Sequence, residues 1–269
     1  MARYELTDEQ WLLVEPLLPP QDRTTPGGNW KPHRKVVNGI FWILFSGAPW
    51  RDLPERYGSH QTAHDRLDPL AERRHVGPRA RCPASEGRRS GIARLFAVER
   101  RFHQHPRHPR RRRGRFKKGP QALGVSPGGF GSKVHLISEA GGLPIARVLT
   151  QGNRNEQPVF DGLLDQALAN SHGRCPRRLA ADRAYSKDLL RRRLSELGIE
   201  VVIPWRRHEH LHDRTPLNEP AYKGRNVIER CVGRLKEMRR IGTRYEKLAS
   251  NYSAMLTLGM AVLYLRALT

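Results

Sequence analysis

The spacing of hydrophobic and polar positions predicts a group of short helices over residues 1–66. In LTDEQWLLVEPLL, Thr7 stands three residues before Gln10, the interval of a capping box, and the apolar residues after it share one side of a helix. The stretch VVNGIFWILFSGAPW reads as a mostly apolar helix that should end at its Gly-Ala-Pro sequence. Small helices with basic flanks are typical of a helix-turn-helix domain, and an ordinary helical subdomain is the alternative.

A different pattern covers residues 116–269. SKVHLIS and LPIARVLT alternate as strands do and flank the turn at Gly141-Gly142, so they predict a hairpin. EQPVFDGLLDQALA and SKDLLRRRLSELG have helical spacing, and RRLAAD and IEVVIP read as further strands. The segment from about Arg225 to Leu268 is expected to be helical throughout. A hairpin followed by alternating helices and strands predicts an α/β fold with a mixed sheet.

Residues 67–115 fit neither pattern. They have no sustained hydrophobic period and are rich in Arg, Pro and His. A segment of this composition cannot bury enough apolar surface to fold, so it is expected to be disordered. The chain therefore divides into a helical domain at 1–66, a basic segment at 67–115 and an α/β domain at 116–269.

The charge balance narrows the class of partner. The chain carries 49 Lys and Arg residues against 26 Asp and Glu residues, a net charge of +23. Such an excess favours a polyanion, with nucleic acid first and an anionic membrane surface second, whereas a merely solvated basic surface is the alternative. No apolar run approaches the ~18 residues that a membrane span needs. We therefore expect a cytoplasmic protein that binds DNA or RNA, with no membrane partner.

The stretch YKGRNVIERCVGRLK carries a charged stripe. At about 100° of rotation per residue, Tyr222, Glu229 and Lys236 fall on one line of a helix, with Arg225 about 60° to one side. The adjacent arc is apolar and consists of Val227, Ile228, Cys231, Val232, Leu235 and Met238. A solvated ladder of ion pairs gives the same stripe, so the spacing leaves both interpretations open.

A second candidate residue lies in LAADRAYS. Asp182 follows an apolar strand, and the carboxyl ends of strands are where α/β sheets place ligand-binding and catalytic groups. The alternative is that Asp182 only caps the following helix.

Together these two stretches resemble the DDE transposases of bacterial insertion sequences, in the IS-four/IS-five-like superfamily with the signature Y-x2-R-x3-E-x6-K. Tyr222, Arg225, Glu229 and Lys236 match that spacing without a gap. The resemblance implies an RNase H-like catalytic domain preceded by a helix-turn-helix-like DNA-binding domain. It also implies cleavage and transfer of double-stranded DNA at the terminal inverted repeats and the target, by a homo-oligomer assembled on DNA in the bacterial cytoplasm and associated with the nucleoid.

The resemblance also implies roles for the matched residues. Asp182 and Glu229 would be the second and third carboxylate ligands of Mg²⁺ or Mn²⁺, because hard divalent cations prefer carboxylate oxygens. Two such ions about 4 Å apart can activate the nucleophile and stabilise the leaving oxygen. Arg225 and Lys236 would hold DNA phosphates, and Tyr222 would position the nucleophile or the DNA backbone.

The first carboxylate of the family's triad is missing. The family would continue FAV with Asp-Gly, whereas this chain continues with Glu99-Arg100-Arg101 and has no Asp between Asp68 and Asp161. Written as CGA-CGG-TTC-CAC, residues 100–103 read Asp-Gly-Ser after a shift of one base, and the same shift of RHVGP gives Gly-Thr-Trp-Asp. We interpret residues 68–114 as translated out of the ancestral frame, with a damaged first strand. Glu99 is a weak substitute for the missing ligand.

The sequence therefore predicts an insertion-sequence transposase by descent that is catalytically impaired. One alternative is a non-catalytic DNA-binding remnant that inhibits an intact transposase. Another is a basic protein that binds nucleic acid without sequence preference. A fully active enzyme requires that Glu99 serves as a ligand or that ribosomes change frame.

Overall fold

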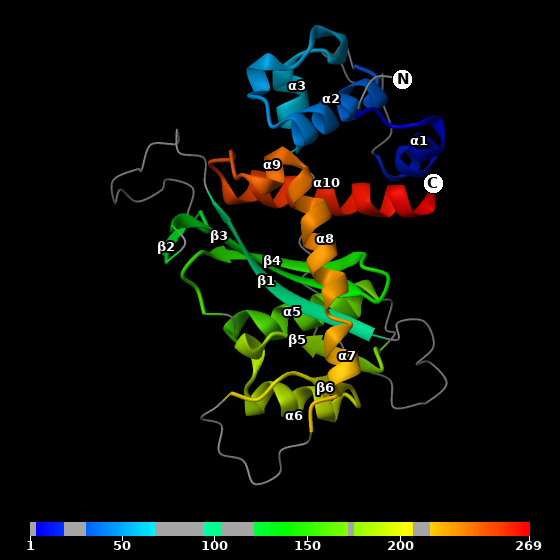
Figure 1. The fold of residues 1–269 in the computed structure, drawn as a ribbon. Helices are drawn as coiled ribbons and strands as arrows, with labels where there is room; N and C mark the ends of the chain where they lie inside the picture. Colours follow the sequence, from blue (N-terminus) through cyan, green and yellow to red (C-terminus); the bar gives the residue numbers. More distant parts are fainter. Residues whose placement is uncertain are drawn as a thin grey trace. The chain divides into compact units, whose positions relative to one another are not determined.

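The computed structural model describes residues 4–18, 31–67, 94–103, 121–127, 129–155, 157–171, 175–206 and 216–269 (Figure 1). The chain divides into two compact units. Among the described residues, unit 1 holds those up to 67 and those from 235 onward, and unit 2 holds those from 94 to 234. This division differs from the predicted one, because residues 235–269 group with the N-terminal helices and not with the sheet.

Unit 1 is helical in its described residues. Its helices are α1 (Asp8–Val14), α2 (His33–Ser46), α3 (His60–Asp65), α9 (Arg239–Gly242) and α10 (Ala249–Leu268), with short 3-10 turns at Glu15–Leu17, Trp50–Asp52 and Glu55–Tyr57. The predicted capping box is confirmed, since the Thr7 side chain accepts from the Gln10 backbone N–H and the Gln10 side chain accepts from the Thr7 N–H. α2 ends where predicted, at Gly47, whose φ of 70° suits glycine.

The apolar faces of these helices form the core of unit 1. α2 contributes Ile40, Ile43 and Leu44, which are fully or almost fully buried. α10 packs so closely that a side chain added at Gly259 would collide with Ile241 of α9. Among the described residues, no helix combines the length and the apolar character that crossing a membrane requires.

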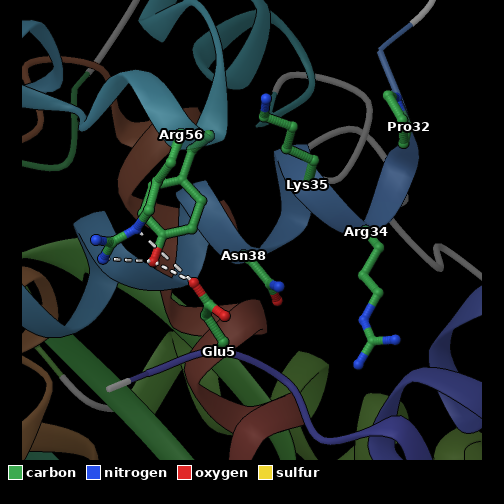
Figure 2. Close-up of a pocket in the computed structure, with 7 residues that line it drawn as sticks. Glu5, Pro32, Arg34, Lys35, Asn38 and Arg56 are labelled. Carbon is green, nitrogen blue, oxygen red and sulfur yellow. Dashed lines mark hydrogen bonds and ion pairs between the residues drawn. The ribbon is translucent and has the colours of Figure 1, made fainter. Parts of the chain in front are cut away.

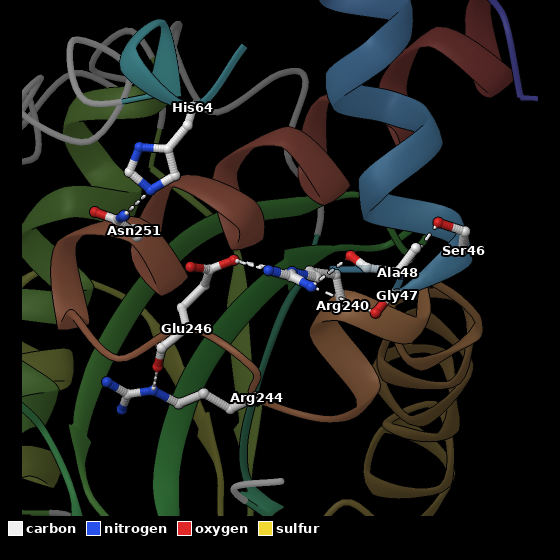
Figure 3. Close-up of polar contacts among 8 residues, drawn as sticks. All are labelled: Ser46, Gly47, Ala48, His64, Arg240, Arg244, Glu246 and Asn251. Atoms are coloured by element: carbon white, nitrogen blue, oxygen red, sulfur yellow. Dashed lines mark hydrogen bonds and ion pairs between the residues drawn. The ribbon is translucent and has the colours of Figure 1, made fainter. Parts of the chain in front are cut away.

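The prediction that residues 225–268 are helical throughout is wrong. α8 (Asn226–Glu237) ends before the bend at Met238, the short α9 follows, and residues 243–248 are not helical before α10 begins. The interruption is stabilised by buried polar groups (Figure 3). The Arg244 side chain is fully buried, and its Nε donates to the Glu246 carbonyl oxygen at 3.1 Å. A helix that stops leaves backbone carbonyl groups without their helical partners, and here side chains supply hydrogen bonds instead. The spacing of hydrophobic residues alone does not reveal such a break.

The best satisfied of these groups is Arg240. Its Nε and Nη2 both lie 2.9 Å from Glu246 Oε1, and its Nη1 donates to the carbonyl oxygens of Gly47 at 3.3 Å and Ala48 at 2.8 Å. The Arg240 and Glu246 side chains are only 5% and 6% exposed. This buried ion pair joins α9 to the end of α2 within unit 1 (Figure 3).

Unit 2 contains a mixed sheet, which confirms the predicted α/β class. Its strands are β1 (Arg94–His103), β2 (Gly124–Ser126), β3 (Gly129–Glu139), β4 (Pro144–Gln151), β5 (Arg178–Ala181) and β6 (Glu200–Val202). The order is β2-β3-β1-β5-β6, with β4 paired to β3. β3 pairs antiparallel with β1, β2 and β4, whereas β5 runs parallel to both β1 and β6.

The helices of unit 2 are α5 (Gln157–Asn170), α6 (Asp188–Glu196), α7 (Glu219–Lys223) and most of α8. The buried cluster between α5, α6 and the sheet includes Ile137, Ile145, Phe160, Leu163, Leu164, Leu168, Leu179, Leu190 and Leu194. α8 is anchored to the β3–β4 turn, where Arg234 Nη2 donates to the Gly142 carbonyl oxygen at 2.8 Å. These contacts fix the elements that carry the candidate site.

Residues 94–103 form β1, the strand that the sequence analysis expected to be damaged. β1 lies between β3 and β5 and pairs with β3 from Leu95, opposite Glu139, to His103, opposite Gly131. Strand pairing uses backbone N–H and C=O groups, which every residue except proline supplies, so an altered order of side chains does not prevent it. The rest of the basic segment, and with it the expected disorder, lies outside the described residues.

Candidate functional site

Asp182 lies at the carboxyl end of β5, as predicted. Its backbone is extended, with φ −63° and ψ 155°, and it begins the short turn η5 (Arg183–Tyr185). Asp182 is the N-cap residue of this turn, but its side chain makes no capping hydrogen bond. Instead, Asp182 Oδ1 forms an ion pair with Arg225 Nη1 at 2.6 Å.

The turn that carries Asp182 is held in place by the buried side chain of Tyr185. Tyr185 is buried, and its backbone N–H donates to the Asp182 carbonyl oxygen at 2.9 Å. The Tyr185 hydroxyl lies 3.0 Å from His135 Nδ1, and His135 Nε2 lies 3.1 Å from Thr150 Oγ1. Our sequence reasoning did not single out His135 or Tyr185. A histidine in the otherwise apolar part of SKVHLIS was the available signal.

Arg225 forms ion pairs with both Glu229 and Asp182. Arg225 Nη1 lies 3.2 Å from Glu229 Oε1 as well as 2.6 Å from Asp182 Oδ1. The two carboxylate oxygens therefore cannot be farther apart than the sum of these distances. The centre of the Arg225 guanidinium lies 5.4 Å from the centroid of the Tyr222 ring. Four of the predicted site residues thus converge in unit 2.

The segment around Arg225 is not one helix. Tyr222 belongs to α7, Gly224 and Arg225 form a turn, and α8 begins at Asn226. From there on, the predicted faces of the helix hold. Ile228, Cys231, Val232 and Leu235 are buried, and Asn226, Arg230, Gly233 and Glu237 are exposed. Lys236 is exposed in the last turn of α8, seven residues beyond Glu229.

The core face of α8 fixes the helix that carries Glu229. Cys231 is fully buried there, and burial raises the pKa of its thiol to about 11. Such a thiol stays protonated and packs as a small apolar side chain. The position of Glu229 therefore follows from packing on the opposite side of the same helix.

The register between β1 and β5 shows which positions of β1 are in phase with Asp182. The last residue pair between β1 and β5 is Ala97 with Ala181, and Asp182 follows at the end of β5. Successive positions of a strand alternate between two faces, so Arg100 lies in the same phase of β1 as Asp182, and Glu99 lies in the other phase. Positions 98, 100 and 102 therefore share the phase of Asp182, and the predicted substitute, Glu99, does not.

The described residues do not fit a complete divalent-cation site. Carboxylate oxygens are the right ligands for Mg²⁺, but Asp182 and Glu229 already share one counterion, the Arg225 guanidinium, which leaves a single net negative charge at the cluster. Among the described side chains, no group of three or more His, Cys, Asp or Glu residues is gathered for a metal ion. The side chains of Arg225, Asp182 and Glu229 are 19%, 29% and 34% exposed, so solvent reaches the two carboxylates.

A second candidate site is a basic cavity of about 420 Å³ in unit 1 (Figure 2). It is lined by Glu5, Pro32, Arg34, Lys35, Asn38, Arg56 and Tyr57. Arg56 Nη2 donates to the Tyr57 hydroxyl at 3.0 Å, and that hydroxyl donates to Glu5 Oε1 at 2.8 Å. Burial is the main reason why the pKa of Tyr57 is raised. Arg34 pairs with Asp8 and Arg56 lies 3.8 Å from Glu5, so Lys35 is the lining cation that makes the cavity a candidate contact for an anion.

Comparison with known proteins assigns the chain to a family. The family model "Transposase DDE domain" matches residues 93–264, and "Putative transposase of IS4/5 family" matches residues 6–76. The chain is 35% identical over 199 residues to "Putative transposase for insertion sequence element IS402" of Burkholderia cepacia, covering 72% of this chain and 88% of that protein. The chain belongs to the DDE-type transposases of bacterial insertion sequences, which confirms the resemblance drawn from the sequence.

Other similarities are weaker. The chain is 27% identical over 135 residues to "Putative transposase for insertion sequence element IS6501" of Brucella ovis, covering 50% of this chain and 98% of that protein. Among solved structures, the Mos1 strand transfer complex aligns at 14% identity with a TM-score of 0.31, covering 88% of this chain and 87% of that one. A TM-score this low carries no argument about fold or function.

Proposed function

We propose that this transposase-family chain binds double-stranded DNA and, as written, does not cleave it. The observation that carries the proposal is the convergence of Asp182 and Glu229 on one nitrogen of Arg225. Two of the three carboxylates that the family's chemistry requires are thus held together at the end of β5. At position 100, which strand register puts in the same phase as Asp182, this chain has arginine, and a positive charge there would repel a divalent cation instead of binding it.

The finer features implied by the resemblance belong to this proposal. They are an RNase H-like arrangement of unit 2, a helix-turn-helix-like arrangement of the N-terminal helices, and Mg²⁺ or Mn²⁺ as the cation of the intact family members. They also include assembly as a homo-oligomer on terminal inverted repeats and target DNA in the cytoplasm. Tyr222 beside Arg225 supports a role for both in contacting the DNA backbone, since guanidinium groups bind phosphate.

The proposed frame change explains why position 100 carries the wrong charge. The one-base shift that turns CGA-CGG into Asp-Gly starts within codon 100, and strand register puts this position in the same phase as Asp182. These two arguments are independent, since one uses the genetic code and the other uses backbone pairing. The two family matches also cover part of the basic segment, residues 67–115. Only residues 77–92 lie outside both matches, so most of this segment still aligns with the family.

The test begins with the nucleotide sequence of codons 64 to 118. We expect a one-base shift to restore Asp-Gly after FAV, and a gene repaired in this way to cut DNA carrying the ends of its own element. The chain as written should give no cleavage under the same conditions. The matched control is the repaired gene with Glu229→Gln, which should be inactive again. Cleavage by the chain as written would overturn the proposal.

DNA binding is proposed for the basic cavity of unit 1. Lys35 is exposed, and within the described part of the chain it has no polar partner. Lys35→Gln and Arg56→Gln should each weaken binding of a duplex and lower the slope of affinity against salt concentration by about 1 for each DNA phosphate that the variant no longer binds. Lys247→Gln, on an exposed side chain of the same unit, is the control. Fluorescence anisotropy at several salt concentrations measures both quantities.

The same titration separates the alternatives. A DNA-binding remnant should prefer duplexes that carry the element's ends over scrambled duplexes, because specific proteins typically gain several orders of magnitude over non-specific binding. A basic protein without sequence preference should bind both duplexes alike, with a steep salt dependence. The net charge of +23 supports the second alternative, and membership of the transposase family supports the first.

A further inference from the structure

The Arg225 guanidinium lies between two carboxylates but is poorly satisfied. One nitrogen, Nη1, forms the ion pairs with both Asp182 and Glu229. Guanidinium groups bind carboxylates best in a two-pronged manner, with two parallel N–H···O bonds. That geometry is absent here, because a single nitrogen is shared between two oxygens on different elements.

A second nitrogen of Arg225 reinforces this point. Within the described residues, Arg225 Nε is buried and has no hydrogen-bond partner. A buried donor without a partner destabilises the arrangement in which it occurs. Arg240 in unit 1 is different, because Nε, Nη1 and Nη2 all have partners. Arg225 is thus held by charge more than by complementary geometry, so displacing it costs less.

We propose that Arg225 is a built-in counterion that holds Asp182 and Glu229 in place of a divalent cation, so that cation binding and the Arg225 ion pairs exclude each other. The inference rests on the proposed function, in which these carboxylates descend from cation ligands. Two neighbouring carboxylates repel each other unless a positive charge lies near both. Arg225 supplies that charge, and a cation bound to the same oxygens would meet the guanidinium at short range.

The substitution Arg225→Gln tests this competition. It removes the positive charge and keeps a polar side chain beside the two carboxylates. We expect the variant to bind Mn²⁺ at least about tenfold more tightly than the wild type, since removing a cation from within hydrogen-bonding range of both ligands removes its repulsion. The measurement is a titration of the full chain with Mn²⁺, following the free ion by electron paramagnetic resonance.

Two matched variants make the result specific. Arg230→Gln removes one positive charge from the exposed side of α8 and should leave the Mn²⁺ affinity within about threefold of the wild type, because exposed charges are screened. Arg225→Gln combined with Glu229→Gln should lose the gained affinity. A gain in Arg230→Gln as large as in Arg225→Gln would assign the effect to net charge and overturn the proposal. An Arg225→Gln variant that binds Mn²⁺ no more tightly than the wild type would also overturn it.

Thermal unfolding with and without Mn²⁺ provides a second test of the proposal in case Arg225→Gln is unstable. The proposal expects Mn²⁺ to raise the Tm of Arg225→Gln, or to restore its fold, while changing the wild-type Tm no more than NaCl of the same ionic strength does. An unfolded variant that Mn²⁺ does not rescue counts against the proposal. None of these measurements requires DNA. A failure of DNA binding or of the repaired enzyme would therefore overturn the proposed function without deciding the competition.

Discussion

Two arginine–carboxylate clusters of this chain have the same chemistry and opposite character. Arg240 and Glu246 in unit 1 are almost fully buried, and the guanidinium also donates to the backbone carbonyl groups of Gly47 and Ala48. Arg225 in unit 2 is partly exposed, shares one nitrogen between two carboxylates and leaves its Nε without a partner among the described residues.

The difference in burial and in hydrogen bonding distinguishes the structural ion pair of Arg240 from the candidate functional site around Arg225. A buried pair repays its desolvation only when the geometry is good and the remaining donors are satisfied, which holds for Arg240. An open cluster with two carboxylates and one poorly held cation is instead arranged so that its cation can be exchanged. Burial and donor satisfaction, more than the identity of the residues, distinguish the two.

The largest effect is expected from Glu246→Gln. The substitution leaves the buried Arg240 charge uncompensated, and breaking one side of a buried pair typically costs about 3–5 kcal/mol. Urea unfolding followed by tryptophan fluorescence should show the loss. Replacing the pair together, with Arg240→Met and Glu246→Leu, should recover most of the stability, because the uncompensated charge is gone. An unchanged midpoint in Glu246→Gln would mean that this pair is not structural.

The next effect comes from the buried face of α8, which fixes the helix that carries Glu229. Because burial raises the pKa of Cys231 from 9.0 to about 11, the neutral thiol stabilises the folded state below pH 9. That contribution is lost as the pH rises from about 9 to 11 and is about 3 kcal/mol in total. Cys231→Ala should therefore show a shallower fall of Tm over this pH range than the wild type. Equal slopes would contradict the assignment.

The sequence predicted much of the fold because local patterns decided it. The Thr7 capping box, the Gly47 helix end and the exposed and buried faces of α8 all follow from residues close in the chain. The break at residues 243–248 could not be predicted from local patterns. The Arg240 side chain beside it donates to the carbonyl groups of Gly47 and Ala48, which lie more than 190 residues earlier in the sequence. The grouping of the C-terminal helices with unit 1 was missed for the same reason.

The structure brings four of the predicted residues together, in contacts that the sequence did not predict in full. Tyr222, Arg225, Glu229 and Asp182 could be named from spacing and from the position of Asp182 after a strand. That Arg225 would bind both carboxylates depends on how α8 packs against the sheet, which no local pattern contains. The pair of Arg225 with Glu229 is a local i, i+4 contact of the kind that the ion-pair alternative allows, whereas its pair with Asp182 lies outside any local pattern. A role of Arg225 with phosphate stays a prediction.

Removing Arg225 should affect stability less than removing Glu246. In Arg225→Gln the two carboxylates lose their counterion but remain partly solvated, so the expected loss is about 1 kcal/mol at low salt. The loss should shrink at ~1 M NaCl, where charges more than about 3 Å apart are screened. Urea unfolding at the two salt concentrations measures this change. A loss as large as that of Glu246→Gln, and insensitive to salt, would abolish the distinction between the clusters.

The smallest effect sets the baseline for both clusters. Arg34 and Asp8 form an ion pair at 2.5 Å, but their side chains are 36% and 82% exposed. Exposed pairs of this kind contribute roughly 0–1 kcal/mol, because water solvates both partners well. Asp8→Asn should therefore change the free energy of unfolding by less than about 0.5 kcal/mol, with Arg34 still donating to the Leu6 carbonyl oxygen. If this exposed pair matched Arg225 in its cost, partial exposure would not explain why the Arg225 cluster is weak, and the open arrangement of Asp182 and Glu229 would need another cause.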